Sequence, residues 1–159
     1  MAKILVTYYS RTGNTAQMAD LVAQAAASVE GAEVVTRPVE EITPQDLLAY
    51  DGLIMGSPVY YGLPAAELKK LLDDSVQFHG QLAGKVGGAF ASSGGLAGGN
   101  ETTILAILQM LLVHGMIVKG EASGDHYGPV AVGAPDGRSA GECEKLGRNV
   151  AALVVALFG

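Results

Sequence analysis

The chain has 159 residues, of which 49% are hydrophobic and 16% charged, and its formal net charge is −6 at pH 7. This length suits one domain, and the hydrophobic share excludes a disordered chain. The negative charge disfavours a nucleic-acid partner, whose phosphates would be repelled. One cysteine, Cys143, excludes an internal disulfide, so we expect a reduced, cytoplasmic protein with an inert thiol. No apolar stretch reaches the ~20 residues that a membrane span needs.

The first half of the sequence predicts strands and helices in alternation. Lys3–Tyr9 is apolar and β-branched, which is typical of a strand buried on both faces of a parallel sheet. A polar loop follows at 10–15, and apolar residues then recur at helical spacing up to Gly31. The next predicted elements are a strand at Glu33–Arg37, a short helix from Pro44 to Leu48 capped by Thr43, a strand at Asp51–Gly56, and a helix that Pro64 opens.

The second half continues the alternation. We expect a strand at Lys85–Ser92, a helix at Glu101–His114 with Asn100 as its N-cap, a last strand at Met116–Lys119 that can resume at Val130–Val132, and a closing helix at Ser139–Leu157. About five alternations of strand and helix predict a doubly wound parallel α/β sheet in a single domain over residues 1–159. In such sheets the ligand lies beyond the carboxyl ends of the strands, where the strand order reverses. The loops at 10–15, 57–63 and 92–100 lie there.

The first of these loops, Ser10–Thr15, has the composition of a phosphate site. It joins a buried strand to a helix whose first backbone N–H groups are free, and its hydroxyl side chains add donors. Gly13 allows the backbone to pass close to phosphate oxygens. Neither Gly-x-Gly-x-x-Gly nor a Walker-type motif is present, which disfavours a dinucleotide or P-loop site. The alternative is simple helix capping by Thr12 or Asn14.

The sequence resembles the flavodoxins over essentially its whole length. The loop Ser10–Thr15 matches their phosphate-loop pattern, and the spacing to Gly56–Gly62 and Phe90–Gly94 is also similar. The resemblance implies a three-layer sandwich with a five-stranded parallel sheet of order 2-1-3-4-5 and helices on both faces. It also implies FMN as the cofactor.

Within that superfamily, the second half resembles the Trp-repressor-binding-protein-A type of NAD(P)H:quinone oxidoreductases. The residues that carry this resemblance are Phe90–Gly94, Gly98–Thr103, His114–Met116, Tyr127-Gly128 and Pro135–Ser139. Two features depart from that type: the phosphate loop reads as an ordinary flavodoxin loop, and the chain is short. The resemblance implies a homodimer or homotetramer, for which the Val113–Val118 region and Phe78 could furnish contacts.

The flavin ring needs a flat apolar wall and backbone donors along its edge. Residues 58–61 offer the wall, with one tyrosine stacked on the ring and the other turned to solvent, and glycines let the main chain approach. The alternatives are two ordinary tyrosines and a merely flexible glycine loop. The predicted cofactor residues are Ser10, Arg11, Thr12, Gly13, Asn14, Thr15, Ser57, Pro58, Val59, Tyr60, Tyr61, Gly62, Ser92, Ser93, Gly94, Gly95, Gly98 and Gly99.

His114 has two interpretations. It can cap carbonyl groups at the end of its helix. The resemblance instead places it near the flavin as the catalytic residue, where a positive imidazole would favour the reduced cofactor. No metal-ligand spacing is visible.

Two functions follow from the resemblance. The first is an enzyme that transfers two electrons from NAD(P)H to a quinone-like acceptor. The alternative is a flavodoxin, a one-electron carrier between redox partner proteins, for which an acidic surface is also suited.

Overall fold

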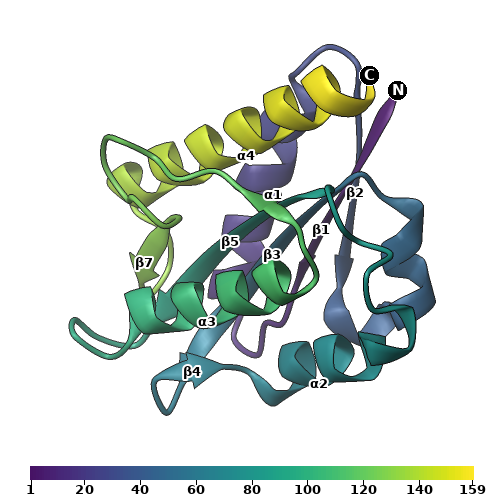
Figure 1. Ribbon diagram of the computed structural model, residues 1–159. Helices are drawn as coiled ribbons and strands as arrows, with labels where there is room; N and C mark the ends of the chain where they lie inside the picture. The colour runs from purple at the N-terminus through teal and green to yellow at the C-terminus, as the bar shows by residue number, and fades with distance from the viewer.

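The computed structural model describes residues 1–159, and its centre is a parallel sheet of order β2-β1-β3-β5-β6 (Figure 1). The path consists of β2 (Ala32–Pro38), β1 (Ala2–Tyr8), β3 (Gly52–Tyr60), β5 (Val86–Ser93) and β6 (Ile117–Val118). The short strand β4 (Leu63–Pro64) pairs antiparallel with the end of β3 and lies off this path. The predicted order 2-1-3-4-5 is therefore confirmed, since the fourth and fifth positions are those of β5 and β6.

The fifth position of the sheet is divided between two short strands. β6 pairs with Val86 and Gly87 at the start of β5, whereas β7 (Val130–Val132) pairs with Ala91–Ser93 at its end. Residues 119–129 leave the sheet between them. The predicted resumption of the last strand at Val130–Val132 is thus confirmed. The two short strands occupy the same edge of the sheet, and residues 119–129 connect them outside it.

The four α-helices cover the sheet on both faces (Figure 1). The helices α1 (Asn14–Ala27) and α4 (Gly137–Phe158) bury their apolar residues together with Ile4, Val6 and Phe90. The second core lies on the other face of the sheet and contains apolar residues of α2 (Ala66–Asp74) and α3 (Asn100–Val113). Leu5 belongs to this core, because its side chain points to the opposite face from those of Ile4 and Val6. Because neighbouring strand residues point to opposite faces, the continuous apolar runs of β1, β3 and β5 supply both cores. Three 3₁₀ turns complete the chain, η1 (Val39–Glu41), η2 (Pro44–Ala49) and η3 (Ser75–Phe78).

Two predicted helix starts are wrong. Pro64 does not open a helix, because β3 runs on to Tyr60 and returns as a hairpin in which Pro64 pairs with Val59; α2 begins at Ala66. Asn100 is not the N-cap of α3, because the N-cap position is taken by Gly99 with φ 120°. The start of the last helix is two residues earlier than predicted, since Asp136 caps it by accepting the Ser139 N–H at 2.8 Å.

The two helices of one face meet at a glycine. Gly147 of α4 is buried against α1, and a Cβ there would collide with the carbonyl oxygen of Val22 and lie 3.0 Å from the nitrogen of Ala26. Both atoms belong to helix backbone, which cannot move aside cheaply. The close approach of α1 and α4 therefore depends on the missing side chain.

We expect Gly147→Ala to lower the free energy of unfolding by about 1–3 kcal/mol, because overpacking outweighs the better helix propensity of alanine. Gly141→Ala in the same helix is the matched control. Its added Cβ would meet no atom within 4 Å, so it should raise stability by about 0.5–1 kcal/mol. Urea unfolding of both variants measures the two signs, and stabilisation by both would show that α1 and α4 can separate at no cost.

Candidate functional site

The three loops expected to bind a ligand meet at the carboxyl edge of the sheet. The guanidinium carbon of Arg11 lies 4.8 Å from the ring centroid of Tyr60, which joins the first loop to the second. The hydroxyls of Thr15 and Ser92 are 2.8 Å apart, which joins the first loop to the third. Thr102 Oγ1, in the first turn of the helix that follows the third loop, donates to the Gly62 carbonyl of the second loop at 3.0 Å. Each loop is fixed to both of the others.

The first loop presents free donors at the start of α1. The hydroxyl oxygen of Ser10 accepts the N–H groups of Gly13 and Ala16 at 3.2 and 3.3 Å. The N-cap position is Gly13, with φ 101° and no capping side chain, so capping by Thr12 or Asn14 is not seen. The N–H groups of Asn14 and Thr15 begin the helix and have no partner within it. Together with the positive end of a 14-residue helix, they suit a phosphate group.

Arg11 and Thr12 are exposed on the same loop. Hydrogen bonding to Tyr9 raises the pKa of the Arg11 guanidinium, with smaller contributions from its charge interactions with Tyr60 and Tyr9. The side chain is thus a permanent positive charge near the helix start. Burial raises the pKa of the Tyr60 phenol, which keeps that ring neutral.

The second loop is a tight hairpin whose two tyrosines have different surroundings. Tyr60 meets the edge of the Tyr9 ring at a centroid distance of 6.1 Å. Tyr61 has φ 49° and is fully exposed, so its ring is free to cover a ligand. The hydroxyl of Ser57 already has two partners within the chain, because it donates to the Pro58 carbonyl and accepts the Ala65 N–H. Val59 packs against the core with its side chain, and Pro58 is half-buried beside it.

The third loop is held by a residue that we did not predict as part of the site. The Ser93 hydroxyl donates to the Gly95 carbonyl and accepts Nδ2 of the buried Asn100 at 2.8 Å. This orientation leaves Asn100 Oδ1 buried without a donor. The signal that could have found Asn100 is an amide directly after a glycine run, at the first residue of a helix. Gly94 and Gly98 are exposed and their backbone is accessible.

A backbone contact closes the gap between the second and third loops. A Cβ at Gly99 would lie 2.8 Å from Gly62 Cα, so the two main chains approach each other directly. The only two non-glycine residues with positive φ, Tyr61 and Ala97, lie in these loops. Backbone strain of this kind clusters at binding sites. Free helix N–H groups, an exposed aromatic ring and accessible glycine backbone fit the phosphate and the planar ring of FMN.

His114 does not lie with the three loops. It follows the last residue of α3, and a 14-residue helix separates it from Asn100 by about 21 Å. Its Nε2 is 2.8 Å from the hydroxyl of Ser75, which itself donates to the Leu72 carbonyl, so His114 donates and is the Nε2–H tautomer. Burial, and to a lesser extent neighbouring His79, lowers the pKa of His114. The lowered pKa disfavours the positive imidazole on which the predicted catalytic role relies, and that role stays a prediction.

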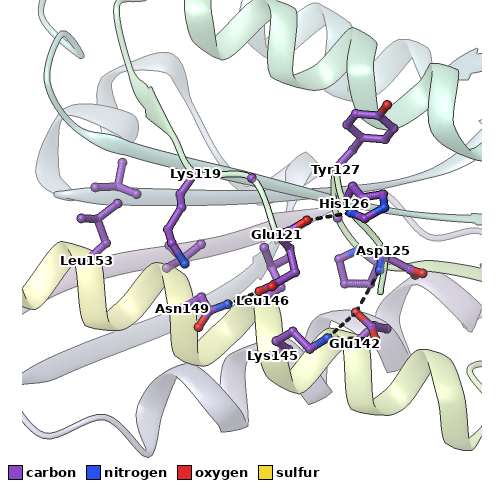
Figure 2. A pocket seen from close by; sticks show the side chains of 15 residues that line it. Lys119, Glu121, Asp125, His126, Tyr127, Glu142, Lys145, Leu146, Asn149 and Leu153 are labelled. Carbon is purple, nitrogen blue, oxygen red and sulfur yellow. Dashed lines mark hydrogen bonds and ion pairs between the residues drawn. The ribbon is translucent and has the colours of Figure 1, made fainter. Parts of the chain in front are cut away.

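A small cavity lies away from the loops, between residues 119–129 and α4 (Figure 2). Its polar groups pair with one another: Asn149 Nδ2 donates to Glu121 at 2.8 Å, and Glu142 accepts Lys145 Nζ at 3.1 Å and the Asp125 N–H at 3.2 Å. These bonds attach residues 119–129 to α4, and the strand β7 that follows them pairs with β5. The polar groups around the cavity therefore have a structural role.

Other chemistry is limited by what surrounds each group. Burial raises the pKa of the Cys143 thiol to about 12, which makes it inert as predicted. No cluster of three or more metal-binding side chains is present. None of the helices has the length and apolar character to cross a membrane.

Comparison with known proteins places this geometry in a family. The model of the NADPH-dependent FMN reductase family matches residues 35–128. The flavodoxin of Aquifex aeolicus (strain VF5) is 43% identical over a 166-residue alignment that covers 99% of this chain and 89% of that protein. Flavodoxin 2 from Bacillus cereus is 28% identical, with a TM-score of 0.75 over 99% of this chain and 100% of the other.

A flavodoxin, WrbA-like protein from Agrobacterium tumefaciens shares the fold at a TM-score of 0.81. It is 24% identical, and the match covers 97% of this chain and 98% of that one. The whole-length relatives and the family match agree with the loops described above in pointing to FMN. The chain belongs to the flavodoxin-like family of FMN-binding redox proteins.

Proposed function

We propose that this protein is an FMN-dependent oxidoreductase of the Trp-repressor-binding-protein-A type, which passes two electrons from NAD(P)H to a quinone-like acceptor. The reaction converts NAD(P)H, a proton and a quinone into NAD(P)⁺ and a quinol. The observation that supports it is the difference between two loops. The hairpin at 60–63 carries Tyr60 and Tyr61, whereas residues 93–99 contain no aromatic side chain. Hydride transfer needs two rings in close contact, and a small-residue loop leaves room for the second ring.

The residues of this chain bind and orient the cofactor. The loop Ser10–Thr15 holds the phosphate through backbone N–H groups and the charge of Arg11. Asn100 and Ser93 fix the glycine-rich loop, because the hydroxyl of Ser93 is bonded on both sides. FMN, when bound, supplies the redox chemistry, so the protein needs no nucleophile of its own.

A one-electron carrier is the second candidate. The 43% identical relative from Aquifex aeolicus is named flavodoxin, and its match extends over 99% of this chain. A net charge of −6 also suits electrostatic docking to a basic redox partner. Because His114 lies away from the loops, one argument for the enzyme is lost. The two functions must therefore be distinguished by whether NAD(P)H reduces the bound flavin.

Replacing Thr12 and Thr15 together with alanine should weaken FMN binding at least tenfold, since hydrogen bonds to a charged group are worth about 1.5–3 kcal/mol each. Riboflavin is the matched control ligand because it lacks the phosphate. The double variant should lose less affinity for riboflavin than for FMN, because only the effect of the broken Thr15–Ser92 contact is common to both ligands. Fluorescence quenching measures both affinities. Equal losses for the two ligands would place the phosphate elsewhere and indicate a general disturbance of the Thr15–Ser92 contact.

Anaerobic addition of NADPH or NADH to the FMN-loaded protein should remove the visible flavin absorbance within seconds, followed by recovery when a quinone is added. This is the expected result for an enzyme that accepts hydride. Inertness toward both nucleotides, with reduction by dithionite in two separate potential steps, would favour the carrier.

A second arm of that experiment tests where the nucleotide approaches. Leu96, at the tip of the third loop, is 89% exposed. Leu96→Trp should slow reduction by NADPH about tenfold by covering the open side of the site, while dithionite reduction and FMN affinity stay unchanged. The control is Leu157→Trp on α4, at 50% exposure. Unchanged NADPH reduction in Leu96→Trp would show that this loop does not border the path.

His114→Asn should lower the melting temperature, because Ser75 loses its donor and a buried ring is removed, at a cost of about 1–3 kcal/mol. The rate of flavin reduction per bound FMN should stay within about twofold of wild type. Since the folded-state pKa of His114 is lowered, the unfolded chain takes up a proton first as the pH falls below about 6.5, and stability drops. The variant should lack this part of the acid dependence. A tenfold slower reduction at normal stability would restore the catalytic role.

A further inference from the structure

A second pocket lies between the third loop and β7. Leu96 and Ala97 at the tip of the loop line one side of it, and Val130–Val132 of β7 line another. Its volume is about 410 Å³, which is within the range of small-molecule sites. Figure 1 shows β7 and the beginnings of α3 and α4 together at one end of the fold. The pocket borders the third loop but includes none of the residues predicted to bind FMN.

The charged groups that line this pocket are three carboxylates and one guanidinium. Arg138 already uses both of its terminal nitrogens, because Nη1 donates to Asp125 at 2.8 Å and Nη2 donates to the Val130 carbonyl at 2.6 Å. The ion pair with Asp125 cancels one charge of each sign, so Glu101 and Asp136 leave the pocket with a net negative charge. A phosphate group in the pocket would therefore be repelled.

No other cation lines the pocket. Lys145 of α4 pairs with Glu142 and lines the neighbouring cavity of Figure 2. Lys119 lines that cavity too, and it follows β6, which pairs with the start of β5 rather than with its end. Arg11 belongs to the first loop, where the phosphate of FMN is predicted to bind. The charge of Glu101 and Asp136 is thus not offset within the pocket.

The groups that remain free in the pocket are hydrogen-bond acceptors. Both bonds that the Asp136 side chain accepts from Ser139 go to Oδ1, which leaves Oδ2 available. The same bonds lower the pKa of Asp136, so its carboxylate stays ionised. Asn100 also lines the pocket; it is only 6% exposed, and its Oδ1 is buried without a donor. A ligand that fits these groups brings hydroxyl or amino donors and no negative charge.

We propose that this pocket holds the adenosine half of the reducing nucleotide and selects NADH over NADPH, an inference that rests on the proposed function. The ribose of NADH brings hydroxyl donors, for which a carboxylate is the usual acceptor in nucleotide sites. Its adenine brings a flat apolar ring to Leu96 and Val132, which are 89% and 45% exposed. NADPH carries a phosphate in place of one ribose hydroxyl, so it loses a donor and adds negative charge beside Glu101 and Asp136. A lysine of a redox partner would pair with the carboxylates but leave the apolar side chains uncovered.

The first measurement is stopped-flow reduction of the FMN-loaded protein by NADH and by NADPH. The wild type should be reduced at least about tenfold faster by NADH. Glu101→Gln combined with Asp136→Asn should lower this ratio at least about fivefold, because two charges that repel the 2′-phosphate are removed. Asparagine caps a helix as well as aspartate does, so α4 keeps its start. Glu30→Gln combined with Glu33→Gln is the matched control. It removes the same charge at the amino edge of the sheet, where Glu33 pairs with Lys3, and should leave the ratio unchanged.

The second measurement is calorimetric binding of NAD⁺ and NADP⁺ to the oxidised, FMN-loaded protein, in which no hydride is transferred. NAD⁺ should bind at least about tenfold more tightly, and the Glu101→Gln and Asp136→Asn double variant should narrow the difference. Equal reduction by the two nucleotides, or faster reduction by NADPH, would overturn the selectivity and leave the enzyme standing. Tighter binding of NAD⁺ without flavin reduction by NADH would count against the proposed function alone. A ratio that the double variant does not change, or that the control changes equally, would show that this pocket does not set the preference.

Discussion

The parallel sheet constrains everything else in this molecule. Because β1, β3 and β5 run in the same direction, their carboxyl ends reach one edge, and each continues directly into one of the three loops of the site. The centre of the sheet is packed tightly enough to hold these ends in place. Gly56 has no side chain, and the ring of Phe90 from the neighbouring strand fills the space that a Cβ would take. A loop that starts from such a strand cannot shift without breaking the core.

The site is then completed by contacts between the loops. The Thr15–Ser92 hydroxyl pair is buried, and the Gly62–Gly99 approach involves main chain only. Such contacts are short and leave little freedom, which is how a site is prepared before its ligand binds. The loop tips, by contrast, remain exposed at Tyr61 and Leu96. The bases of the loops are thus fixed while their tips stay open to solvent, which is an arrangement suited to a bound cofactor.

The sequence predicted the strands and the three loops because their signals are local. Apolar β-branched runs, a polar loop before an apolar helix, and clustered glycines can each be read within a dozen residues. Sequence reasoning misses the contacts that depend on a distant partner. Pro64 belongs to a hairpin because β3 continues to Tyr60, and the hydroxyl of Ser57 is bonded to the Ala65 N–H because the chain folds back there. His114 shows the same limit, since Ser75, to which it is bonded, is 39 residues away.

The start of α3 ties the second and third loops to each other. Its first turn belongs to the site, where Asn100 fixes the glycine-rich loop and Thr102 bonds to the hairpin. Together with the direct approach of Gly62 and Gly99, these two contacts hold the second and third loops within one chain. A helix that is anchored in the core therefore also positions the backbone around the cofactor.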